Sequence, residues 1–178
     1  GRAARAGAAL VVPSFVPASV LGRGGAVAPS EKIVLGGIGI GGRGEQVLSV
    51  LLENEDARFV AVCDVRAERR EHVKRLANSR YGDDGCAAYR DLRELLARDD
   101  IDAVLIATGD RWHTMASILA ARAGKDVYCE KPCTLTIAEG GILADELRRT
   151  GRILQAGMQR RNVPNFAFAV QLARSGKL

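Results

Sequence analysis

Short apolar runs alternate with segments of helical periodicity along most of this chain, and this alternation restricts the fold more than any other feature. Each run is short enough to be one buried strand, and each intervening segment is long enough for a crossover helix, which parallel strands require. We therefore predict an α/β fold with a doubly wound parallel sheet, the Rossmann fold. The six predicted strands cover residues 32–38, 58–63, 86–89, 102–108, 126–130 and 152–157.

Apolar positions at helical spacing predict helices between these strands. The first helix should cover about residues 45–54. The last should follow a capping box formed by Thr136 and Glu139 and end before Gly151. Two further stripes consist of Val73, Leu76 and Ala77, and of Met115, Ile118 and Leu119, the second with Gly124 as its C-terminal cap.

A glycine-rich turn joins the first predicted strand to the first predicted helix. Residues 39–44 read GIGGRG and match G-x-G-x-x-G. Gly39 would make the tight turn, Gly41 would let a phosphate approach the backbone, and Gly44 would allow close packing of helix and strand. Gly42 and Arg43 complete the predicted phosphate-binding turn. Taken alone the motif is weak, because such turns also serve only for packing.

An acidic residue at the end of the second strand strengthens the dinucleotide interpretation. Asp64 lies twenty residues after Gly44, where a carboxylate can accept hydrogen bonds from an adenosine ribose. The same carboxylate would repel a 2′-phosphate, so NAD is the predicted cofactor. NADP stays open because Arg66, Arg69 and Arg70 follow closely and could accommodate that phosphate.

Polar residues follow the later strands as well. In an open parallel sheet the ligand lies beyond the carboxyl ends of the strands, so these residues should face the cofactor. The predicted cofactor-binding residues at these ends are Thr108, Asp110, Trp112 and His113 after the fourth strand, Glu130, Lys131 and Pro132 after the fifth, and Gln159 after the sixth.

Five motifs in one order carry a family resemblance. Together they resemble the N-terminal half of the Gfo/Idh/MocA oxidoreductases. The motifs are GIGGRG, CDVR, ATGDRWH, AGKDVYCEKPC and LQAGMQRRN. The resemblance implies a Rossmann domain that binds NAD or NADP, followed by a sheet domain that binds a sugar or cyclitol and forms a homo-oligomer. We accordingly assign residues 31–162 to the Rossmann domain and residues 163–178 to the start of the connection to a second domain, absent from this chain.

The resemblance implies a catalytic role for Lys131. It corresponds to the lysine of the family's Glu-Lys-Pro motif, which lies between the nicotinamide and the substrate and helps to orient or deprotonate the reacting hydroxyl. Hydride loss from a carbinol requires removal of the hydroxyl proton, which a positioned amine can accept. The alternative is a surface lysine on a turn. A cis peptide bond before Pro132, which would aim the lysine, is a further hypothesis.

Two positions depart from the family pattern, and one residue stays ambiguous. Gly109 stands where proline is frequent, which loosens the turn under the nicotinamide, and Cys133 stands where an apolar residue is usual. His113 could cap or pack a helix as well as act near the cofactor.

Three functions follow from this interpretation. The leading one is an NAD(P)-dependent dehydrogenase acting on a sugar, polyol or cyclitol, of which this chain is the nucleotide-binding part and inactive alone. The first alternative is an NAD-dependent glycosidase of the same family, against which Lys131 argues, because the resemblance implies that those relatives lack a lysine there. The second is a redox-silent dinucleotide-binding module.

Cysteine spacing and charge argue against metal and nucleic acid. The chain has four cysteines and two histidines, with no C-x-x-C pair, so we predict no metal site and buried thiols that act as small apolar side chains. The net charge is +5, but Arg2, Arg5 and Arg23 lie in the first thirty residues, which contain no acid. The remainder carries only +2, which argues little for nucleic acid.

Residues 1–30 differ in composition from the rest. Basic residues precede a short apolar run, residues 8–12, and then proline, serine, glycine and alanine dominate. This segment is too short and too interrupted by proline to span a bilayer, so we predict no membrane partner. It resembles the remnant of an export signal, with a loose cleavage neighbourhood near Ala28, or else a disordered tail. Periplasmic export in folded form, as by a twin-arginine route, is the expectation, with the cytoplasm as the alternative.

Overall fold

The computed structural model describes residues 27–177, without the side chains of Pro29 and Asn162. The chain divides into two compact units, residues 1–32 and 33–178. The described part of the first unit contains one short 3₁₀ helix, η2 (Pro29–Glu31). Most of the predicted export signal lies outside the described residues, so that expectation stays a prediction.

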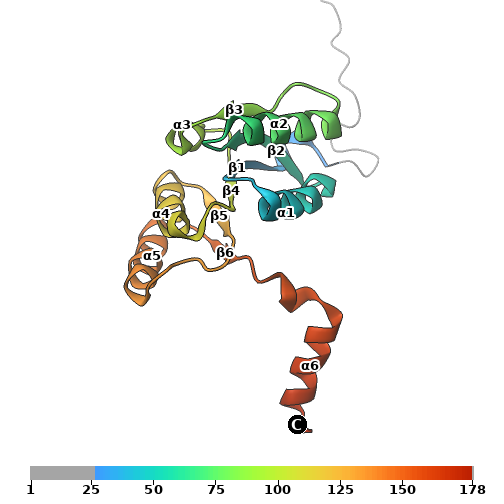
Figure 1. Cartoon of the computed structure of the whole chain (residues 1–178), viewed down its shortest axis with the longest axis vertical. Coiled ribbons are helices and arrows are strands. Elements are labelled where there is room, and N and C mark those ends of the chain that lie inside the picture. The colour runs from blue at the N-terminus through green and yellow to red at the C-terminus, as the bar shows by residue number, and fades with distance from the viewer. Residues whose placement is uncertain (1–26, 178) are drawn as a thin grey trace, which may run out of the picture. The chain divides into compact units, whose positions relative to one another are not determined.

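The second unit is built on one parallel sheet of six strands, labelled in Figure 1. The order is β3-β2-β1-β4-β5-β6, so the chain starts at the centre, builds outward to β3, and then crosses to build the other half. This confirms the predicted doubly wound sheet. The strands are β1 (Ile33–Ile38), β2 (Ala57–Cys63), β3 (Ala87–Tyr89), β4 (Ala103–Ile106), β5 (Asp126–Cys129) and β6 (Leu154–Ala156).

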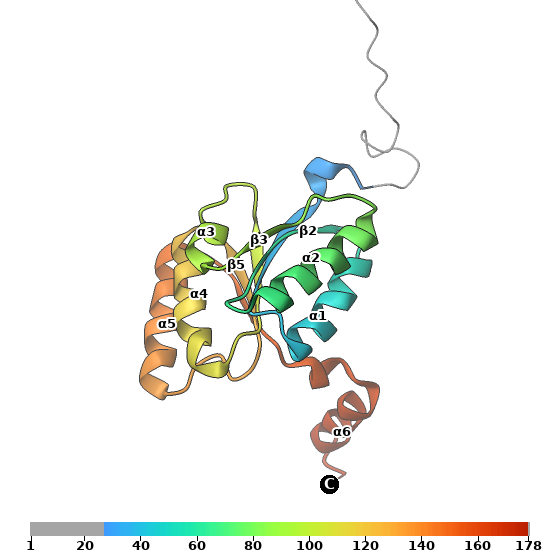
Figure 2. The ribbon, with the colours of Figure 1, turned by 45° about the horizontal axis from the view of Figure 1, so that its top comes forward.

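Helices cover both faces of the sheet, as Figure 2 shows. On one face α1 (Gly42–Glu53) and α2 (Ala67–Tyr81) pack over a cluster centred on Phe59 and Leu48. On the other, α3 (Leu92–Leu96) and α4 (His113–Arg122) cover a second cluster. Helix α5 (Ile137–Thr150) packs against α4. Both clusters consist of apolar side chains removed from water, which is the main favourable contribution to folding.

The strong helix signals that were predicted are confirmed. Thr136 and Glu139 form the reciprocal capping box of α5, and Gly151 follows that helix in the left-handed conformation. Gly124 has a positive φ just after α4. Helix α1 begins at Gly42 rather than near residue 45, because the glycines of the turn conceal its start in the apolar pattern.

Two helices escaped the sequence analysis. Helix α3 is five residues long, too short to show a periodic stripe. Helix α6 (Pro164–Arg174) falls in the segment expected to begin a connection; it contacts the 3₁₀ helix η4 (Gln159–Asn162) and has no buried residue. Across residues 27–177, no helix combines the length and apolarity needed to cross a membrane.

Candidate cofactor-binding site

A cleft of about 990 Å³ opens at the carboxyl ends of the central strands. Its lining includes the glycine-rich turn after β1, Asp64 after β2, and Thr108 after β4. These strand ends neighbour one another because the chain reverses its winding between β1 and β4, the topological switch point at which doubly wound sheets bind ligands. The volume suits a large small-molecule ligand.

The glycine-rich turn leaves no room for side chains at two of its positions. Gly39 has a φ of +70°, and an added Cβ would lie 2.4 Å from Cγ2 and 2.7 Å from Cα of Thr108. A Cβ on Gly44 would lie 2.9 Å from the Cβ of Ala107, so this glycine brings α1 against the end of β4. The turn is thereby fixed against the fourth strand.

Of the two glycines between them, Gly42 faces open space and Gly41 faces the end of the Arg69 side chain. A Cβ on Gly42 would meet nothing within 4 Å, and one on Gly41 would lie 3.0 Å from Nη1 of Arg69. Helix α1 starts here with no side-chain cap, so the amides of its first turn have no acceptor from a capping side chain. Exposed amides at a helix N-terminus and a backbone without side chains fit a pyrophosphate.

Asp64 is buried at the end of β2 with one carboxylate oxygen already engaged. Its Oδ1 accepts a hydrogen bond from the backbone amide of Arg66 at 2.9 Å. Its Oδ2 lies 4.0 Å from Nη1 of Arg69, a long ion pair that leaves lone pairs free for a further donor. Only 6% of Asp64 is exposed, and it lines the cleft. A ribose hydroxyl is a donor of the kind this carboxylate could accept.

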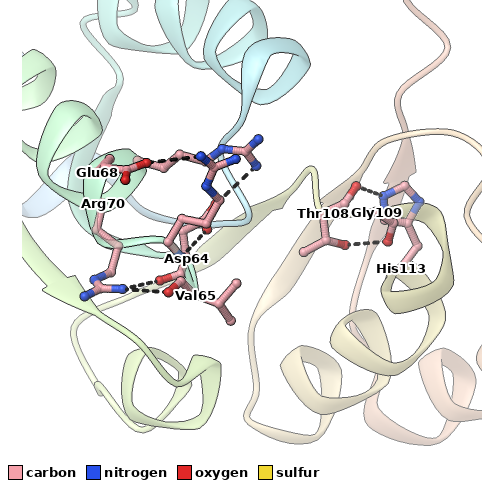
Figure 3. A network of polar contacts seen from close by, with 9 residues as sticks. Asp64, Val65, Glu68, Arg70, Thr108, Gly109 and His113 are labelled. Atoms are coloured by element: carbon pink, nitrogen blue, oxygen red, sulfur yellow. Dashed lines mark hydrogen bonds and ion pairs between the residues drawn. The ribbon is translucent and has the colours of Figure 1, made fainter.

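The side chains of Arg66, Arg69 and Arg70, the three arginines that could accommodate a 2′-phosphate, point in different directions. Arg70 donates from Nη1 to the carbonyl oxygens of Asp64 and Val65, at 2.7 and 3.3 Å (Figure 3). Arg66 donates to Glu68 at 3.1 Å and does not line the cleft. Arg69 does line it. The binding role of Arg66 stays a prediction.

After β4, the chain forms the 3₁₀ helix η3 (Asp110–Trp112) and then α4. Trp112 lines the cleft with about half of its surface exposed. Asp110 is exposed and accepts from the amide of Arg111 at 3.0 Å, which is a local turn contact. Gly109, the departure from the family pattern, lines the cleft, and a Cβ there would meet nothing within 4 Å.

His113 joins two strand ends rather than facing the cleft. Its ring is buried, with Nδ1 2.6 Å from the carbonyl oxygen of Pro132 and Nε2 3.1 Å from that of Thr108, the second contact being drawn in Figure 3. Both partners are acceptors, so each contact becomes a hydrogen bond when that nitrogen carries a proton. The packing interpretation of His113, left open by the sequence, is the one this geometry favours.

The turn after β5 is connected to the glycine-rich turn by an ion pair. Glu130 is buried and accepts from Nε of Arg43 at 3.0 Å, while its second oxygen accepts from the amide of Lys131 at 3.3 Å. Lys131 is exposed, and its ammonium has no hydrogen bond or ion pair within the described part of the chain. The Lys131–Pro132 peptide bond is cis, which confirms the hypothesis made from the sequence.

Gln159, predicted from the end of β6, begins η4. Its Oε1 is buried and has no hydrogen-bond partner among residues 27–177, a condition that buried amides rarely tolerate without a ligand or water. Gln159 does not line the cleft.

The cleft thus gathers about half of the predicted residues. Gly39, Gly41, Gly42, Arg43, Asp64, Thr108 and Trp112 line it. The other predicted residues lie outside its lining, and their roles stay predictions. They are Gly44, Arg66, Asp110, His113, Glu130, Lys131, Pro132 and Gln159. The sequence analysis missed the segment 90–94, which follows β3 and also lines the cleft. The same strand-end rule that selected Thr108 and Lys131 could have found it.

Three of the four thiols are buried, as predicted, and the fourth, Cys133, is half-buried. Burial raises the pKa of Cys63 and of Cys129 to about 12 and that of Cys86 to about 11. Cys129 ends β5, and Cys133 lies past the turn, half-buried. All four are free, and their thiol forms pack as small apolar groups.

A doubly wound parallel sheet, a glycine-rich turn at a helix N-terminus and a buried acid after β2 define a dinucleotide-binding Rossmann domain. Residues 33–158 match the family model for the Gfo/Idh/MocA proteins, described as an oxidoreductase family with an NAD-binding Rossmann fold. The chain belongs to this family.

Three similar proteins show how far the match extends. Myo-inositol 2-dehydrogenase from Thermotoga maritima is 32% identical over 145 residues, 81% of this chain and 41% of that protein. A glycosyl hydrolase family 109 protein from Saccharopolyspora erythraea is 35% identical over 126 residues, 68% of this chain and 27% of its own. The crystal structure of an NAD-binding protein from Listeria innocua has a TM-score of 0.70 and 29% identity, covering 82% of this chain and 41% of its own. The chain spans less than half of each.

Proposed function

We propose that this chain is the nucleotide-binding part of an NAD-dependent dehydrogenase that oxidises a CH–OH group of a sugar, polyol or cyclitol. The observation that carries the proposal is the Arg43–Glu130 ion pair, which joins the glycine-rich turn to the turn bearing Lys131. This contact joins the predicted phosphate-binding turn to the turn that carries the predicted catalytic amine.

The cofactor would be held by groups already in place. The first-turn amides of α1 would bind the pyrophosphate, and Asp64 would accept from the adenosine ribose. NAD, when bound, supplies the hydride acceptor. Trp112 lines the cleft after β4 and would lie at the nicotinamide end, on the opposite side of the glycine-rich turn from Asp64.

Lys131 would move the proton. Its side-chain nitrogen has no partner within residues 27–177, so it is free to meet a substrate, and in its unprotonated form it could accept the proton of a substrate hydroxyl. Glu130 accepts from the amide of Lys131 and would set the direction of this turn.

The substrate class is supported by the myo-inositol 2-dehydrogenase relative. We also propose that the whole protein is a homo-oligomer, exported in folded form, with a cytoplasmic location as the alternative.

A glycosidase is the second candidate, because the family 109 relative is 35% identical. In that chemistry NAD would oxidise the substrate transiently and then return the hydride, so that the net reaction would consume no NAD. Lys131 favours the dehydrogenase. A redox-silent module is the third candidate and predicts cofactor binding with no turnover at all.

Turnover in a polypeptide that includes the substrate-binding domain implied by the family tests these candidates. With myo-inositol and NAD, the proposal expects NADH to accumulate in the wild type, and Lys131→Ala to lower kcat about a hundredfold or more while NADH affinity stays within threefold. Lys177→Ala, remote in sequence from the strand ends, is the matched control. Unchanged turnover in Lys131→Ala would remove the catalytic assignment. Release of p-nitrophenol from nitrophenyl glycosides without net NADH would favour the glycosidase instead.

A further inference from the structure

The carboxylate of Glu130 stands on the residue before Lys131, yet the two side chains are not paired. Glu130 is only 4% exposed, whereas Lys131 is exposed and its side-chain nitrogen has no hydrogen bond or ion pair within residues 27–177. A buried carboxylate is costly unless a cation compensates it, and an ammonium on the next residue would be a ready partner. Another contact must therefore satisfy Glu130.

Arg43 supplies that contact from the start of α1. Its Nε donates to Oε1 of Glu130 at 3.0 Å, and its Nη1 donates to Oε1 of Gln46 at 2.9 Å. The guanidinium is thus held at two of its nitrogens, one by Glu130 and one by its own helix. The side chain of Arg43 is 40% exposed and that of Glu130 only 5%, so solvent screens the arginine end of this ion pair more than the carboxylate end.

The carboxylate of Glu130 is also confined on its other sides. Its Oε2 accepts from the backbone amide of Lys131 at 3.3 Å. A Cβ on Gly157, just after β6, would lie 2.9 Å from Oε1 and 3.1 Å from Cα of Glu130, so the backbone at the end of β6 lies close against this residue. Both carboxylate oxygens are therefore engaged, one by Arg43 and one by the Lys131 amide, and neither by the Lys131 side chain.

The other charged or titratable side chains beyond these strand ends do not compensate Glu130. They have no ion pair within residues 27–177, and they are Asp110, Arg111 and His113 after β4, and Arg160 and Arg161 after β6. Asp110 accepts from a backbone amide of its own turn. The guanidinium of Arg160 lies over the ring of Phe166, 5.2 Å from its centroid. If Arg43 were removed, the cation nearest in sequence to the freed carboxylate would be the ammonium of Lys131.

We propose that Arg43 is a positioning residue for Lys131: by pairing with Glu130 it keeps that carboxylate from capturing the Lys131 ammonium, and it thereby leaves the Lys131 amine free to meet the substrate. The inference rests on the catalytic role proposed for Lys131. A buried ion pair that loses one partner leaves an uncompensated charge, so Glu130 without Arg43 would turn to the next cation. A captured lysine would be held in its charged form, which accepts no proton. This role is separate from the phosphate contact predicted for Arg43.

Competitive acetylation of the present chain with a limiting amount of acetic anhydride tests the contact without any substrate. The reagent attacks unprotonated amines, so mass spectrometry of the Lys131 and Lys177 peptides gives the reactivity of Lys131 relative to another exposed lysine of the same chain. Arg43→Met should lower this ratio about threefold or more, because the freed Glu130 holds Lys131 as its ammonium. Adding Glu130→Gln to Arg43→Met should restore the ratio, because the new amide carries no charge.

Turnover in a polypeptide that includes the substrate-binding domain gives the second readout. Arg43→Met should lower kcat about tenfold while NADH affinity changes less than about threefold, and the double variant Arg43→Met with Glu130→Gln should recover most of the lost kcat. A purely structural role of Arg43 predicts the opposite order, because the second substitution would disturb one more buried contact. Arg148→Met, which removes an exposed arginine paired with Asp145 on α5, is the matched control and should change neither readout.

The outcomes separate this inference from the proposed function. Unchanged relative reactivity of Lys131 in Arg43→Met would overturn the inference and leave the proposed function intact, and so would a double variant no more reactive than Arg43→Met. Weaker NADH binding with normal kcat in Arg43→Met would place the guanidinium on the cofactor and would also overturn it. Loss of Lys131 reactivity with unchanged turnover would support the contact between Arg43 and Glu130 as the cause, and would count against the catalytic role of Lys131.

Discussion

The two halves of the sheet build their strand ends in different ways. In the turn after β1 the candidate site is mostly backbone, because Gly39, Gly41 and Gly42 line the cleft there. Around β4 and β5 it depends on side chains that bind one another, as His113 bridges two carbonyls and Glu130 holds Arg43. A site made of backbone depends on the residues of one short segment. A site made of side chains that contact one another depends on how the whole fold brings distant segments together.

Gly39→Ala should be the most damaging of three changes that test this comparison. The new Cβ would lie 2.4 Å from a side-chain atom and 2.7 Å from a backbone atom of Thr108, and alanine would also be strained at a φ of +70°. We expect the free energy of unfolding to fall by about 3 kcal/mol. Urea denaturation measures this. Gly42→Ala, with nothing within 4 Å, is the control and should change stability by less than about 1 kcal/mol. Equal effects would mean that the turn is not fixed by Thr108.

His113→Leu should have the second largest effect, because it removes the two ring nitrogens that contact the carbonyls of Thr108 and Pro132. Leaving these two partly buried contacts unmade should cost about 2 kcal/mol. The same unfolding measurement applies. His72→Leu is the matched control: His72 is about half exposed and its one polar contact within residues 27–177 is with Glu45, so its loss should cost less than about 0.5 kcal/mol. Similar costs for the two variants would refute the bridging role of His113.

Acid should produce the smallest effect, through the two ion pairs of Glu146, one of which joins α5 to α4. Hydrogen bonds from Arg122 and Arg149 lower the pKa of Glu146 from 4.5 to about 2. A lowered pKa in the folded state means that its stabilisation is complete above about pH 4.5 and is lost as the pH falls toward 2. The difference in urea midpoint between wild type and Glu146→Gln should therefore shrink over that range. A difference independent of pH would contradict the assignment.

The sequence predicted the sheet and the glycine-rich turn well because each depends on short segments. A strand is visible as an apolar run, and the turn as glycines between a strand and a helix. Helix α3 was invisible because five residues carry no period. The local capping signals of α5 were confirmed because both partners of the box lie three residues apart.

The side-chain contacts between strand ends could not be predicted in the same way. Arg43 and Glu130 are 87 residues apart, and only the order of the sheet brings them together. His113 faces a carbonyl 19 residues away, and a carbonyl leaves no trace in residue type. Likewise the sequence offered three equivalent arginines after Asp64, and their different directions emerge only from the packing of α2 beside the glycine-rich turn.

The central claim, that this cleft binds NAD with its nicotinamide end near Trp112, is tested most directly by a fluorescence titration with NADH. Trp112 is the only tryptophan of the chain, so its emission reports on that end of the cleft alone. The account predicts saturable quenching together with sensitised nicotinamide emission, and loss of both when excess NAD competes. Absence of quenching, in a chain shown by circular dichroism to be folded, would contradict it.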